Sequence, residues 1–156
     1  LKVARRGIVL AQWAFVVAAL GVVFVAPPLL HLIGSSVSLP GFGMLSLLSA
    51  AFFAERYSAM HIQLYSLTNH IVWHIANGVT GLLMIGLFFA LRPFMGELAI
   101  PAAMLGAYGG FCAWYASRLS LKSLQVGRWE FEWRTTAAPM LVLLSGLAIG
   151  AAIRAS

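Results

Sequence analysis

The sequence SAMHIQLYSLTNHIVWHIANGVTG, residues 58–81, contains most of the residues from which we predict the functional site. It contains three of the four histidines and leads into an apolar run that continues to residue 91. Ionisable side chains within a membrane-length segment are costly unless a neighbour or a ligand uses them. On a helix, Gln63, His70, His74 and Asn77 share one face, because residues three, four and seven apart do so. We therefore predict that this stripe faces a partner helix, a cofactor or a polar headgroup.

The composition indicates a membrane protein. Of the 156 residues, 62% are hydrophobic and only 9% are charged, whereas soluble globular domains carry about 25% charged residues. The mean hydropathy is +0.93. The net charge of +6 comes from short basic flanks between apolar runs, a pattern typical of membrane orientation and not of nucleic-acid binding. We predict an all-α, polytopic membrane helical bundle, with lipids and no nucleic acid among its partners.

Five apolar runs are candidate transmembrane helices, and a polar loop, residues 118–134, is expected before the last one. The runs cover approximately residues 7–33, 41–60, 68–91, 98–117 and 136–153. Pro27 and Pro28 are expected to break the far end of the first. The second crosses the membrane only if its helix continues past Glu55 to about Met60, and otherwise it lies on the surface, which leaves four spans.

The distribution of basic residues favours five spans. Lysine and arginine are concentrated before the first run and in the segment 118–134. The positive-inside rule places both regions on the same side of the membrane. An even number of crossings must then lie between them, which requires the second run to cross.

The histidine-rich stretch does not by itself define a metal or catalytic site. His70 and His74 have the spacing with which two histidines bind one metal ion, but no carboxylate or thiol lies close in the sequence to complete a site. Axial haem ligation by one of them, or hydrogen bonding at the membrane surface, are the alternatives. No nucleophile elbow, phosphate loop or paired carboxylates appear, so we predict neither a metal nor a catalytic residue.

Two motifs resemble a known family. Residues 58–66, SAMHIQLYS, resemble the Ser-Pro-His-x-x-x-Tyr signature of the large cytochrome b anchor subunit of succinate dehydrogenase (respiratory complex II), and Thr80-Gly81 stands where that family has Thr-Gly. Residues 111–118, FCAWYASR, are similar to its Tyr-His-x-Trp-Asn-Gly-x-Arg pattern at the aromatic, Trp and Arg positions. The resemblance covers about residues 58–156.

The chain departs from the family pattern at the family's functional positions. His74, Asn77 and Gly78 stand where the family has the Ser, His and Arg of its quinone site, and Cys112 stands at the haem-ligand position. The resemblance also implies two parts. Residues 61–156 correspond to the three-helix anchor domain, and residues 1–60 form an N-terminal extension with one span plus a short second span or surface helix.

The resemblance implies a non-catalytic membrane anchor subunit of succinate dehydrogenase. Such a subunit binds iron–sulfur and flavoprotein subunits, and with a small membrane anchor subunit it forms the site where ubiquinone accepts electrons from the iron–sulfur partner. The headgroup is expected at His74 and Asn77, with His70 and Tyr65 close by. Cys112 is the candidate ligand for haem b, and a small buried residue is the alternative. The implied location is the mitochondrial inner membrane, or else a bacterial plasma membrane.

Two other functions compete with the anchor. One is an accessory or assembly subunit of a respiratory membrane complex that has no site of its own. The other is a small membrane enzyme, because Glu55-Arg56 followed by His61 is similar to the Glu-Arg motif of membrane-bound glutathione transferases. That family has an asparagine shortly after the motif, where this chain has Gln63.

Overall fold

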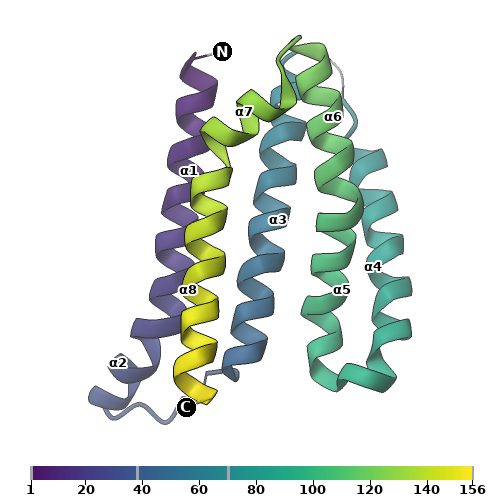
Figure 1. Ribbon diagram of the computed structural model, residues 1–156. Coiled ribbons are helices and arrows are strands. Elements are labelled where there is room, and N and C mark those ends of the chain that lie inside the picture. Colours follow the sequence, from purple (N-terminus) through teal and green to yellow (C-terminus); the bar gives the residue numbers. More distant parts are fainter. Residues whose placement is uncertain (1, 38, 70, 156) are drawn as a thin grey trace.

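A computed structural model describes residues 2–37, 39–69 and 71–155, and over these residues the chain is a helical bundle without a strand (Figure 1). This confirms the predicted all-α class. In chain order the elements are α1 (Lys2–Leu20), the π-helical segment η1 (Gly21–Val25), α2 (Ala26–Leu32), α3 (Phe42–Ser66), α4 (Trp73–Met95), the 3-10 turn η2 (Gly96–Leu98), α5 (Ala99–Ala107), the π-helical segment η3 (Tyr108–Cys112), α6 (Ala113–Ser123), α7 (Arg128–Thr135) and α8 (Ala137–Ala155).

Three helical segments of the described chain are long and apolar enough to cross a membrane: Lys2–Leu32, Trp73–Ser123 and Ala137–Ala155. The second consists of two antiparallel arms, because the chain reverses at η2 (Figure 1). Gly96 makes this reversal with a φ of 56°, a backbone conformation that glycine adopts without steric cost. With 25 residues, α3 is also long enough to cross, but its second half carries Glu55 and Arg56 and is less apolar.

The prediction that Pro27 and Pro28 break the first apolar run is wrong. The helix continues through them to Leu32 after the wider turn of η1. Both prolines lie in the first turn of α2, where a missing backbone N–H is best tolerated. The combination of a π-helical turn and prolines bends a helix, and α2 turns away from the axis of α1 (Figure 1).

The polar segment predicted as a loop is mostly helical. Helix α6 extends to Ser123 and α7 begins at Arg128, so that only residues 124–127 connect them. The segment folds as helices because its polarity follows a helical period. On α7, Phe131 and Thr135 are buried while Trp129 and Trp133 are 84% and 72% exposed, and each pair is four residues apart.

Helix α8 packs closely on the first helical segment through a pair of glycines. Gly146 and Gly150 lie in the sequence GLAIG, a spacing that lets membrane helices approach closely. A Cβ atom on Gly146 would lie 2.8 Å from Leu20, and one on Gly150 would lie 2.7 Å from Phe24. This contact fixes α8 beside α1 (Figure 1).

The central helix is α3, which lies between α1 and α8 on one side and α5 and α6 on the other (Figure 1). It runs without a break across residues 60 and 61, where the sequence placed the boundary between the extension and the anchor domain. At its contact with α6, Ile62 of α3 shares a buried cluster with Ala116, and His61 lies against Ser120. The central position of α3 brings its polar second half into contact with both α6 and α7.

Candidate functional site: a polar cluster beside an apolar cavity

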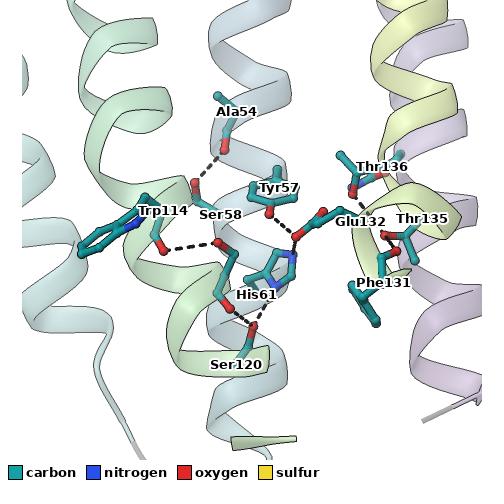
Figure 2. Close-up of polar contacts among 12 residues, drawn as sticks. Ala54, Tyr57, Ser58, His61, Trp114, Ser120, Phe131, Glu132, Thr135 and Thr136 are labelled. Atoms are coloured by element: carbon teal, nitrogen blue, oxygen red, sulfur yellow. Dashed lines mark hydrogen bonds and ion pairs between the residues drawn. The ribbon is translucent and has the colours of Figure 1, made fainter. Parts of the chain in front are cut away.

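A cluster of polar side chains joins α3, α6 and α7 near one end of the bundle (Figure 2). The Tyr57 hydroxyl donates a hydrogen bond to Oε1 of Glu132. His61 Nδ1 lies 2.7 Å from the hydroxyl oxygen of Ser120, and His61 Nε2 lies 3.5 Å from the same Glu132 oxygen. His61 is 0% exposed, so the cluster is held inside the protein. These contacts place the second half of α3 and the segment 118–134 on the same side of the bundle.

The carboxylate of Glu132 determines which nitrogen of His61 carries the hydrogen. Nε2 lies 3.5 Å from the Glu132 oxygen, and a lone pair there would face another acceptor, so the hydrogen belongs on Nε2. Nδ1 then accepts a hydrogen bond from the Ser120 hydroxyl at 2.7 Å. The hydrogens of Tyr57 and of His61 Nε2 are therefore both directed to the same oxygen of Glu132.

A second buried polar contact connects α1 to the same region. The Gln12 amide nitrogen donates to the Thr136 hydroxyl at 3.2 Å, and Gln12 is only 1% exposed. A polar side chain buried at this depth is favourable only when it is hydrogen-bonded. The contact ties the junction of α7 and α8, one turn after Glu132, to the middle of α1.

A cavity of about 600 Å³ lies next to the cluster, between α3, η3, α7 and α8. Its polar lining consists mainly of Tyr57, Arg128 and Glu132. The two exposed tryptophans of α7 also line it. The remaining lining residues are apolar or small: Phe53, Ala54, Gly109, Ala113, Thr136, Ala137 and Met140.

The cavity combines the size and the chemistry of a site for an amphipathic molecule. Ligand pockets are typically about 300–1,000 Å³, mostly apolar, with a few polar groups that fix orientation. Here the polar groups gather where α7 meets α3, and the apolar wall follows α8 and η3. Small residues such as Gly109 leave the space open, because a Cβ there would find only Leu105 at 4.0 Å. A headgroup fits beside Glu132 and a tail fits along α8.

The structure does not bring the predicted headgroup residues into this cavity. His74 and Asn77 are exposed on the outer face of α4, and Tyr65 is half-buried near the end of α3. His70 lies outside the described residues. Thr80, part of the family-like Thr-Gly pair, is buried and donates to the Ala76 carbonyl at 2.6 Å. The prediction that Gln63 shares one helical face with His74 and Asn77 is wrong, because α3 ends at Ser66 and α4 begins only at Trp73. His74 and Asn77 lie together on the exposed side of α4.

Cys112 is buried in a packed apolar cluster and does not line an open cavity. Its side chain is 1% exposed and belongs to a cluster with Ile62, Ala76 and Ala116. These contacts join α3, α4 and α6 through small apolar groups, so the residues around the thiol do not fit a haem group. In the described part of the chain, no group of three His, Cys, Asp or Glu side chains is arranged to hold a metal ion.

Sequence reasoning did not find Tyr57, Ser120 or Glu132. Tyr57 and His61 are four residues apart on α3 and Ser117 and Ser120 are three apart on α6, so helical spacing alone places each pair on one face. Both faces are buried. Serine and histidine side chains are rarely buried without a polar partner, so two such faces would be expected to contact polar groups. The signal was present as two short polar stripes, but nothing in the sequence paired them.

The fold and site define a helical membrane protein with an amphipathic cavity beside a buried polar cluster. No protein-family model matches the chain, and no curated protein or solved structure shows significant similarity to it.

Proposed function

We propose that this chain is a membrane subunit that binds an isoprenoid quinone in the cavity beside α7. The observation that carries the proposal is the amphipathic lining, with Tyr57, Glu132 and Arg128 at one end and apolar or small residues along α8 and η3. A quinone has a ring with polar oxygens and a long hydrocarbon tail. The ring lies beside the polar residues and the tail follows the apolar wall, with its far end in lipid.

The position of α7 supports entry of the ligand from the membrane. Trp129 and Trp133 line the cavity and are also highly exposed, and tryptophan is enriched where membrane hydrocarbon meets the headgroups. A lipophilic ligand dissolved in the bilayer can therefore reach the cavity without passing through water. Arg128 lies beside these indoles on the same helix, where its charge is close to the aqueous surface.

The resemblance over residues 58–156 supports a more specific assembly. We propose that the chain serves as a membrane anchor of a succinate dehydrogenase-type complex, and that its quinone is ubiquinone, in a respiratory membrane such as the mitochondrial inner membrane. The exposed polar face of α4, with His74 and Asn77, is then where the small anchor subunit packs. Mass spectrometry of co-purified chains checks this assembly, and the absence of iron–sulfur and flavoprotein subunits would contradict it.

Quinone binding by the full chain in lipid nanodiscs tests the proposed function. An oxidised quinone quenches tryptophan fluorescence at short range, and Trp129 and Trp133 line the cavity. Titration with a decyl-substituted benzoquinone is expected to quench the emission saturably. In a Trp129→Phe, Trp133→Phe chain, most of the saturable quenching should disappear. Quenching that stays linear with quinone concentration, as for free partitioning into lipid, would refute binding.

A further inference from the structure

The polar end of the cavity has an unequal supply of hydrogen-bond donors and acceptors. The one hydroxyl hydrogen of Tyr57 is already directed to Glu132. Behind the carboxylate, the Nε2–H of His61 faces the same oxygen at 3.5 Å, and His61 is buried and does not line the cavity. Tyr57 and His61 therefore leave no free hydrogen for a molecule that reaches Glu132 from the cavity.

Arg128 supplies donors at the same polar end of the cavity, one helical turn from Glu132. It precedes Glu132 on α7 and is exposed, and both residues line the cavity. A guanidinium group only donates, and an ionised carboxylate only accepts. The complementary ligand therefore donates a hydrogen bond to Glu132 and accepts one from Arg128.

The groups facing the carboxylate from the surrounding helices are consistent with this requirement. Tyr57 and His61 approach Glu132 from α3, and Ser120 of α6 bonds to His61 behind them. The Thr136 hydroxyl, one turn further along the chain, accepts from Gln12. Because the Thr135 hydroxyl donates to the Phe131 carbonyl, the Thr136 hydrogen is directed to the Thr135 oxygen at 3.2 Å. None of these groups supplies a hydrogen to the side of Glu132 that a ligand would approach, apart from the Tyr57 hydroxyl already used.

We propose that Glu132 selects the reduced form of the ligand, so that the cavity binds a hydroquinone in preference to the oxidised quinone. This inference rests on the proposed function. A hydroquinone hydroxyl donates to Glu132, and its second oxygen accepts from Arg128. The oxidised ring has only carbonyl acceptors, and one of them would face the carboxylate without a hydrogen between them. Acceptors brought together in this way are disfavoured, and a buried polar group without a partner is costly.

The test compares the two redox forms of one ligand on the full chain. A decyl-substituted benzoquinone and its hydroquinone are titrated anaerobically into the protein in nanodiscs, with empty nanodiscs as the reference, and binding is followed by calorimetry. The hydroquinone is expected to bind about ten-fold more tightly, a ratio within reach of one charge-assisted hydrogen bond. In Glu132→Gln the amide offers both a donor and an acceptor, so the ratio should fall close to one.

Glu130→Gln is the matched control. Glu130 lies on the same helix, pairs with Arg134 at 3.1 Å and does not line this cavity, so the ten-fold ratio should persist. Equal binding of both forms by the unmodified chain, or tighter binding of the quinone, would overturn the redox selection and leave the proposed function intact. Binding of neither form would overturn the proposed function itself. A ratio that persists in Glu132→Gln would remove Glu132 from the selection, and a ratio of one in the unmodified chain overturns the selection whether or not that variant folds.

Discussion

Gly150→Leu is expected to destabilise the protein by about 1–3 kcal/mol, the usual range for overpacking a close contact. The first atom of the new side chain would lie 2.7 Å from Phe24 and 2.9 Å from Phe42. Two aromatic rings from different segments would have to move together, so local adjustment is difficult. A lower midpoint of thermal unfolding in detergent is the measurement, with helical circular dichroism as the readout.

Gly86→Leu provides the control for this loss of stability. Gly86 lies in the middle of α4 and is exposed, and a Cβ atom added to it would have no neighbour within 4 Å. The two variants make the same chemical change in apolar helices, and only one of them meets a neighbouring helix. Equal midpoints for Gly150→Leu and the unmodified protein would show that α8 does not pack on α1 and α3 as described.

Gly109→Leu is expected to weaken quinone binding at least ten-fold, a change that corresponds to about 1.4 kcal/mol. Gly109 lines the cavity. A Cβ atom added to Gly109 would have its nearest neighbour, the Leu105 side chain, at 4.0 Å. The helix therefore accepts the new side chain, which fills space that the ligand would need. Fluorescence titration with the decyl-substituted benzoquinone in nanodiscs measures the change.

The same Gly86→Leu chain is the control for binding. It should keep the affinity of the unmodified protein because α4 does not line the cavity. Gly109→Leu should also keep its thermal midpoint, which separates a filled cavity from a damaged fold. Unchanged affinity in Gly109→Leu would place the ligand elsewhere.

The fold is largely predictable from the sequence because apolar runs of membrane length are a strong local signal. The errors arise where local signals are weak or compensated. Two consecutive prolines, Pro27 and Pro28, normally favour the end of a helix, but the π-helical turn before them lets this helix continue. The charge of the segment 118–134 favours a loop, although its exposed tryptophans and buried Phe131 follow a helical period.

The candidate site is predictable only in part, for a physical reason. Helical spacing correctly groups His74 and Asn77 on one face, but spacing does not say whether a face points into the bundle or out of it. The cavity needs Tyr57, Gly109 and Glu132 together, and these residues are separated by long stretches of chain. Their meeting depends on how α3, η3 and α7 pack, which no local pattern specifies.

Photolabelling with an azido-substituted quinone tests the central claim most directly. The full chain in nanodiscs is illuminated with the reagent, digested, and mapped by mass spectrometry, with an excess of unreactive quinone as competitor. We expect the label on peptides from the cavity wall, around Tyr57, around Gly109 and within α7. The competitor should prevent this labelling. Label confined to residues 73–81 of α4, around His74 and Asn77, would contradict the cavity as the quinone site and favour the outer face of α4.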